Sequence, residues 1–138
     1  ITSSVLIIQA QRLVRKVCAD CRKETRPKAS TLSALDVTPE MVRRISLPHI
    51  DPKALKFFEG TGCERCDNQG LRGRIGVYEV LSMTESLRQC ILKGGSTTDL
   101  FRMAKEEGML TLRESAIRKA LEGTTTADEV LRVTAGDR

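Results

Sequence analysis

The fold of this chain is decided by two short stretches, VCADCRK at residues 17–23 and GTGCERCDNQG at residues 60–70. Each stretch contains one Cys-x-x-Cys motif, and the pairs are Cys18/Cys21 and Cys63/Cys66. The two-residue spacer lets one tight turn aim both thiolates at a single ion, and four sulfur ligands complete a tetrahedral zinc site. No coordination position then stays open, so the four cysteines predict a structural zinc ion and not a catalytic one.

The two cysteine pairs are separated by the 41 residues 22–62. This gap is longer than the roughly 15–20 residues of a usual zinc ribbon. The sequence therefore predicts a small insertion between two zinc knuckles, pinned at both ends by the metal. Disulfide and redox uses of the cysteines are the alternatives. The first is disfavoured because no signal peptide precedes the cysteines and their count is odd, and the second because a redox motif normally stands alone beside a βαβ unit.

Other reactive residues do not assemble into a recognisable catalytic set. Cys90 stands apart from both pairs and is typical of a small buried hydrophobe. His49 is the one histidine, and it lacks the spacing of a metal ligand. The chain contains no G-x-x-x-x-G-K-[ST] phosphate loop and no nucleophile–histidine–acid arrangement. On its own residues, this chain is not predicted to be an enzyme.

Composition narrows the possible partners. The chain has 138 residues, a net charge of +5 and 30% charged residues of both signs, which favours a soluble cytosolic protein of one or two small domains. The positive balance leaves a stand-alone nucleic-acid-binding zinc module as the alternative function. Aromatic residues are only 3% and the basic residues are dispersed, which argues against that alternative. No apolar run reaches the length of a membrane span.

The local patterns predict an α+β fold that is mostly helical. Residues 5–8 are expected to form a buried strand with no neighbouring strand nearby, as at the torn edge of a larger protein. Residues 9–17 show helical spacing, and residues 22–37 are expected to be loop. A helix is expected from Pro39 to about Ser46, capped by Thr38 and ended by Pro48, with strands at residues 55–58 and 75–80.

Residues after Ser82 are expected to form short amphipathic helices that pack as one orthogonal cluster. Thr84 and Thr98 are expected to open the first two helices, and Gly123 to close the third. Thr126 with Glu129 three residues later predicts a capping box at the start of the last helix.

The order of several motifs resembles the C-terminal part of ATPases of bacterial type II secretion and type IV pilus assembly. The motifs are Ala10-Gln11-Arg12-Leu13-Val14-Arg15 before Cys18-x-x-Cys21, Gly62-Cys63-x-x-Cys66, Gly70-Leu71-Arg72-Gly73-Arg74-x-Gly76-Val77-Tyr78-Glu79, Gly108-Met109-x-x-Leu112-Arg113, and Gly123-x-Thr125-x-x-Asp128-Glu129-Val130-x-Arg132-Val133-Thr134. They cover nearly the whole chain, and only the insertion at residues 22–60 is unmatched.

This resemblance implies three parts. Residues 1–17 would be the final strand and helix of a RecA-like ATPase core, residues 18–81 a tetracysteine zinc subdomain, and residues 82–138 a helical subdomain. The parent would be a cytoplasmic homo-hexamer that uses ATP and Mg²⁺ and sits at the inner membrane through platform and docking proteins. We hypothesise that residues 22–60, presented by the zinc, contact a membrane platform protein. Binding to nucleic acid is not expected.

Overall fold

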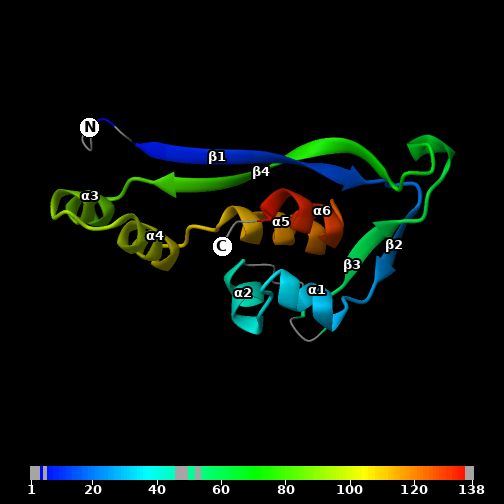
Figure 1. The fold of residues 1–138 in the computed structure, drawn as a ribbon, viewed down its shortest axis with the longest axis horizontal. Helices are drawn as coiled ribbons and strands as arrows, with labels where there is room; N and C mark the ends of the chain where they lie inside the picture. Colours follow the sequence, from blue (N-terminus) through cyan, green and yellow to red (C-terminus); the bar gives the residue numbers. More distant parts are fainter. Residues whose placement is uncertain (1–3, 5, 46–49, 52–53, 136–138) are drawn as a thin grey trace.

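A long antiparallel ribbon joins two parts of the chain that lie far apart in sequence. The computed structural model describes residues 4, 6–45, 50–51 and 54–135. In it, β1 (Ile7–Val17) pairs with β4 (Leu71–Ser82), with the register running from Ile7 opposite Ser82 to Arg15 opposite Arg74 (Figure 1). The register shifts between Arg15 and Val17, just before the first cysteine pair.

A second, shorter ribbon continues beyond the cysteines. It pairs β2 (Arg22–Thr25) with β3 (Phe57–Gly60), with Arg22 opposite Gly60. The first cysteine pair connects β1 to β2, and the second connects β3 to β4 around the short 3-10 helix η1 (Glu64–Cys66). Both connections between the two ribbons therefore pass through the same corner (Figure 1).

The helices cover one side of the long ribbon. They are α1 (Ala29–Ala34), α2 (Pro39–Arg44), α3 (Glu85–Leu92), α4 (Thr97–Glu106), α5 (Leu112–Leu121) and α6 (Ala127–Thr134). In Figure 1, α5 and α6 lie beneath the β1–β4 ribbon, α3 and α4 lie at its far end, and α1 and α2 lie below α5 and α6. Among the described residues, no helix combines the length and apolar character that crossing a membrane requires.

The buried apolar side chains form two separate clusters. The larger one joins the ribbon, the insertion and α5–α6; among its members are Val14, Leu35, Ile45, Phe57, Val77, Ile117 and Val130. The smaller one joins the end of β4 to α3 and α4 through Leu81, Leu87, Ala104 and Met109. The prediction that all the late helices form one cluster is therefore wrong, because α3 and α4 pack on the end of β4 whereas α5 and α6 pack on another part of the ribbon. The division at residues 17 and 81 stays a prediction.

The helix predicted over residues 9–17 is wrong. Ala10, Leu13, Val14 and Val17 happen to recur at helical spacing, but only Val14 and Val17 are buried. This segment is strand because β4, more than fifty residues later, supplies its hydrogen-bonding partner. The first strand is present from Ile7, but Ile7 and Ile8 are exposed and not buried as expected. Long-range pairing of this kind overrides local spacing.

Residues 22–37 also differ from the predicted loop, because they contain β2 and α1. The polar sequence of β2 becomes a strand through its pairing with β3. The start of α1 follows Lys28, whose side chain makes no capping hydrogen bond, so the sequence carries no start signal there.

Most of the helix starts predicted from capping residues are confirmed. Thr38, Thr84 and Thr126 each accept a hydrogen bond from a backbone N–H of the first turn. The helix predicted to open at Thr98 instead begins at Thr97, because Ser96 is the cap and forms a reciprocal capping box with Asp99. The strands at residues 57–60 and 71–82 confirm the two predicted there. The predicted ends at Ser46 and Pro48 lie outside the described residues, as does His49.

Candidate metal centre

The two cysteine turns are held together by backbone hydrogen bonds across the corner. The Cys18 N–H donates to the Gly70 carbonyl oxygen at 2.9 Å, and the Thr61 N–H donates to the Cys21 carbonyl oxygen at 3.1 Å. These bonds continue the pairing of β1 with β4 and of β2 with β3 into the turns. The protein backbone alone therefore brings the two cysteine pairs to one place.

Two glycines make the close approach of the turns possible. A Cβ atom on Gly60 would lie 2.1 Å from the Gly70 carbonyl oxygen, and one on Gly70 would lie 2.5 Å from the Gly60 oxygen. Gly70 also has a φ of +76°, which favours glycine. Between the second cysteine pair and Gly70, Asp67 and Asn68 adopt left-handed conformations with φ of 53° and 60°. This tight turn curls the backbone around the sulfur of Cys66.

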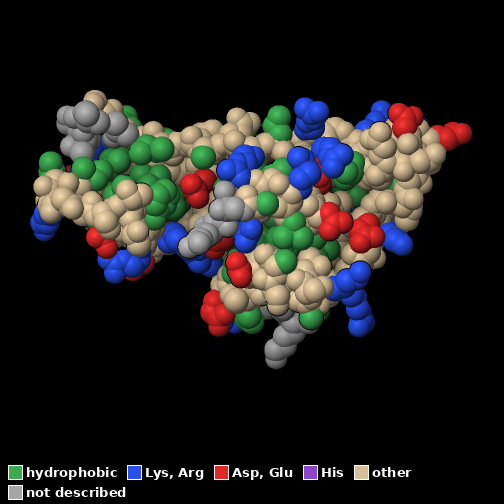
Figure 2. All heavy atoms as spheres, viewed as in Figure 1, with side chains coloured by type: hydrophobic (Ala, Val, Ile, Leu, Met, Phe, Trp, Pro, Cys, Tyr) green, Lys and Arg blue, Asp and Glu red, His purple; other side chains and the backbone are tan. Residues whose placement is uncertain are grey.

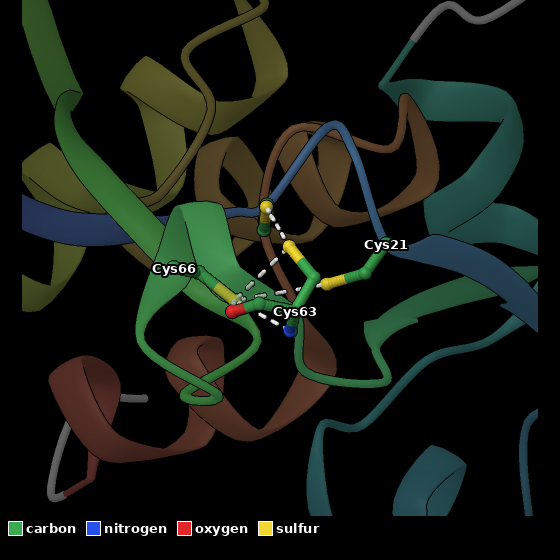
Figure 3. A group of neighbouring side chains, drawn as sticks. Cys21, Cys63 and Cys66 are labelled. Carbon is green, nitrogen blue, oxygen red and sulfur yellow. Dashed lines mark hydrogen bonds between the residues drawn. The ribbon is translucent and has the colours of Figure 1, made fainter.

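All four cysteine Sγ atoms lie within 4.8 Å of one another. Figure 3 shows the sulfur atoms of Cys21, Cys63 and Cys66 turned toward a common point. The Sγ–Sγ distance is 3.7 Å from Cys18 to Cys63, 3.8 Å from Cys21 to Cys66, and 3.7 Å from Cys63 to Cys66. These separations are far longer than the disulfide bond of about 2.0 Å. The four cysteines thus stand as free thiols that could hold a metal ion.

Backbone N–H groups point at the sulfurs. The Gly62 N–H donates to Cys21 Sγ at 3.3 Å, and Cys66 Sγ accepts from the N–H groups of Cys63 at 3.3 Å and Gly70 at 3.2 Å. Such bonds favour a thiolate over a thiol. Cysteine sulfurs must be thiolates to bind a metal ion, and the N–H groups of these two turns stabilise that charged form.

The two thiols of the second pair have pKa values displaced in opposite directions. Burial raises the pKa of the Cys63 thiol to about 11. Burial acts in the same sense on Cys66, which is only 4% exposed, but the N–H groups of Cys63 and Gly70 outweigh it and lower its pKa to about 6. Cys66 is thus the thiol of this pair that ionises first.

The C-terminal segment is docked on the same corner, which sequence reasoning missed. The Val17 N–H donates to the Thr124 carbonyl oxygen at 3.0 Å, and the buried Thr125 hydroxyl donates to the Arg15 carbonyl oxygen at 2.7 Å. The Arg22 guanidinium donates to the Gly123 carbonyl oxygen and lies 5.1 Å from the centroid of the Phe58 ring. No local spacing connects residue 22 with residue 123, so no sequence signal could have found this contact.

Cys90 does not belong to the sulfur cluster. It lies in α3, at the end of the ribbon far from the corner, and it is half-buried (Figure 1). The structure therefore separates it from the paired cysteines, but Cys90 is only half-buried and not the buried small hydrophobe that the sequence predicts.

Comparison with known proteins places this arrangement in a family. The model of the type II/IV secretion system protein family matches residues 1–132, almost the entire chain. The chain belongs to this family. Its resemblance to secretion and pilus ATPases is thereby confirmed, and the corner with its four cysteines is part of the matched region.

Individual relatives come from both pilus and secretion systems. The chain is 37% identical over 131 residues to the type IV pilus assembly ATPase PilB of Thermus thermophilus, covering 95% of this chain and 14% of the relative. It is 35% identical over 134 residues to the PilB protein of Pseudomonas aeruginosa, covering 97% of this chain and 22% of the relative. It is also 35% identical over 134 residues to the type II secretion system protein E of Pseudomonas aeruginosa, covering 97% and 24%. The chain spans a quarter or less of the length of these relatives.

Proposed function

We propose that this chain is the zinc-binding C-terminal region of a hexameric, cytoplasmic ATPase that powers type II protein secretion or type IV pilus assembly. The family match and the names of the relatives support the motor. The observation that carries the proposal is the convergence of four sulfurs from two Cys-x-x-Cys turns. ATP and Mg²⁺ would be bound by the rest of such a protein, and partner proteins would hold it at the inner membrane.

The sulfur geometry fits zinc. Zinc–sulfur bonds of about 2.3 Å in a tetrahedron require sulfurs about 3.8 Å apart. The measured Sγ–Sγ distances of 3.7, 3.7 and 3.8 Å agree with this requirement. Four thiolates in a tetrahedral arrangement are typical of zinc or of iron–sulfur sites, and zinc is the ion of two Cys-x-x-Cys knuckles. The ligands would be Cys18, Cys21, Cys63 and Cys66.

A zinc ion at this position would be structural. Its four protein ligands leave no position for water or substrate. It would join the β1–β2 connection to the β3–β4 connection and so fix the direction in which the short ribbon leaves the long one. The insertion that follows the short ribbon would then move as one body with the β1–β4 ribbon.

The insertion is the proposed docking element for a membrane platform protein. It is not a freely projecting loop, because Leu35 and Ile45 are fully buried against α5 and its neighbours. The Arg44 guanidinium pairs with the buried carboxylate of Glu114 on α5. On the outer side, Glu40 and Arg43 of α2 are exposed. A force on this outer side would therefore pass directly into α5 and the ribbon.

Metal content and thiol reactivity test the zinc proposal. Purified chain should contain one zinc per molecule and expose one reactive thiol, Cys90, before chelation. Addition of a chelator with denaturant should raise the number of reactive thiols to five, the full cysteine count. Absence of metal together with two disulfides would overturn the proposal, since the four sulfurs would then be bonded to one another and could not act as thiolate ligands.

The docking proposal needs a test that leaves the core intact. Deleting the insertion would remove Leu35 and Ile45 from the core, so loss of assembly would say nothing about docking. In the full-length motor, we instead expect Glu40→Arg with Arg43→Glu to reduce pilus or pseudopilus assembly while zinc content and ATP hydrolysis stay normal. Lys93→Glu, at the C-terminal end of α3, is the control. Assembly that tolerates the α2 double variant as well as the control would refute docking through this face.

A further inference from the structure

Three arginines surround a hollow that is lined by the β1–β4 ribbon and by α6. The hollow has a volume of about 490 Å³ and is lined by Leu13, Arg15, Arg74 and Arg132. Arg15 and Arg74 are direct partners in the strand register, as are Leu13 and Gly76, so these residues share one face of the ribbon. Arg132 reaches the same hollow from α6. Figure 2 shows several Lys and Arg side chains on the β1–β4 ribbon beside α6.

The charges around this hollow are not balanced. Glu129 is buried, with 2% of its surface exposed, and its carboxylate pairs with two of the three arginines. The distance is 2.9 Å to Arg15 and 2.8 Å to Arg132. Arg74 makes no ion pair within the described part of the chain. Three guanidinium charges against one carboxylate charge leave a local net charge of +2.

The excess of positive charge around the hollow lowers the stability of the fold. Like charges placed directly opposite each other in an antiparallel pair destabilise the pair, and Arg15 and Arg74 occupy such positions. The side chains of Arg15 and Arg132 are about half exposed, 47% and 53%, so their remaining N–H groups stay accessible. An arginine presents five donors, and Glu129 uses only some of those of Arg15 and Arg132.

We infer that the hollow between Arg15, Arg74 and Arg132 is a binding site for a terminal phosphoryl group, either that of a free polyphosphate anion or that of a nucleotide. A phosphoryl group carries two negative charges and several acceptor oxygens, which matches the local charge of +2 and the three guanidinium groups. A single carboxylate would neutralise only half of that charge. Guanidinium groups bind phosphate through paired N–H donors, which a lysine cannot reproduce. This site is separate from the sulfur cluster and does not depend on zinc.

Arginine side-chain NMR of the full 138-residue chain tests the site directly. We expect sodium pyrophosphate, added at constant ionic strength, to shift the Nε–Hε signals of Arg15, Arg74 and Arg132 in a saturable manner. Arg74→Gln should weaken the affinity about tenfold, as expected for the loss of one charged hydrogen-bonding partner. Arg74→Lys keeps the positive charge but loses the paired N–H donors of the guanidinium. Its affinity for pyrophosphate should therefore lie between that of the wild type and that of Arg74→Gln. Arg74 is the residue to change because it forms no ion pair with the residues that the structure describes.

A matched control and a second ligand make the outcome decisive. Arg43→Gln removes the same charge from the exposed face of α2 and should leave pyrophosphate affinity unchanged. ATP binding more tightly than pyrophosphate would assign the site to a nucleotide, and equal affinity would assign it to free phosphate anions. The inference is overturned if no signal saturates, if Arg43→Gln weakens binding as much as Arg74→Gln, or if poly-glutamate binds more tightly than pyrophosphate. The last result would mark a surface for acidic protein segments.

Discussion

Replacing Glu129 by Gln should weaken the attachment of α6 to the β1–β4 ribbon without releasing it, because Val130 of α6 stays buried in the core. The carboxylate is buried, and its Oε1 atom accepts the Arg15 backbone N–H at 2.8 Å. Its two oxygens also accept both donors of Arg132, at 2.8 and 2.9 Å. A Gln side chain can keep the backbone contact through its oxygen, but its NH₂ group would face a guanidinium. The variant therefore leaves positive charge without its counter-charge.

The size of the effect follows from the pKa of this group. Hydrogen bonds from Arg132 are the main cause that lowers the Glu129 pKa from 4.5 to about 2, and Arg15 adds to them against the opposing effect of burial. Lowering the Glu129 pKa from 4.5 to about 2 corresponds to about 3 kcal/mol. The arginines are half exposed, so water screens part of this interaction. We expect the free energy of unfolding at neutral pH to fall by about 2–3 kcal/mol.

Urea unfolding across a pH series is the assay, with the same zinc concentration in every sample. Because the folded pKa is depressed, the stabilisation is fully present above about pH 4.5, the unfolded value, and is lost as the pH falls toward 2. The difference between wild type and Glu129→Gln should therefore shrink in this window. Loss of metal at low pH affects both proteins and cancels in the difference.

An exposed carboxylate provides the control for this prediction. Glu40 forms a 3.6 Å pair with Arg43 on the surface of α2, so Glu40→Gln should change the stability by less than about 0.5 kcal/mol. The reasoning fails if Glu129→Gln loses no more than this control at pH 7. It also fails if the loss is large but does not vary between pH 7 and pH 3, since the cause would then be packing and not charge.

Three further predictions concern the corner and the core. Gly60→Ala should prevent zinc from binding at one ion per chain, because its Cβ would lie 2.1 Å from the Gly70 oxygen, and metal analysis of the purified variant would show this. Cys63→Ser should abolish stoichiometric zinc whereas Cys90→Ser should retain it, and equal zinc content in the two variants would contradict the four-sulfur site. Phe57→Ala should lower the free energy of unfolding by about 3–5 kcal/mol in urea titration, because the ring is buried in the core that joins the insertion to α5; a loss below 1 kcal/mol would mean that the insertion is not part of that core.

The cysteine cluster could be predicted from sequence because its information is local. A Cys-x-x-Cys pair needs one turn to direct both sulfurs, and two such pairs specify a ligand number without any knowledge of the fold. Helix starts at Thr38, Thr84 and Thr126 were predictable for the same reason, since a capping side chain acts on the N–H groups of the next turn. The predicted capping box at Thr126 is only half formed, because the Glu129 carboxylate is engaged by Arg15 and Arg132.

The strands were the weakest part of the prediction. Residues 9–17 have helical spacing, and only the pairing with residues 71–82 makes them a strand. Residues 22–25 are polar, and they form a strand only because residues 57–60 lie beside them. A strand satisfies its backbone N–H and C=O groups on another segment, so its identity depends on residues that no local window includes.

Local sequence patterns were enough to predict a cluster of four cysteines, several of the helix boundaries and the family, since each of these depends on residues close together or on motifs in a fixed order. Three features could be seen only in the folded chain: both cysteine turns lie at one bend between two ribbons, the insertion is packed against α5, and Arg15, Arg74 and Arg132 share one hollow. The physical reason is that these features arise from contacts between segments separated by forty to more than one hundred residues. Such contacts form through strand pairing and the burial of apolar side chains. Both act between distant segments and produce no recognisable pattern of residue spacing in the sequence.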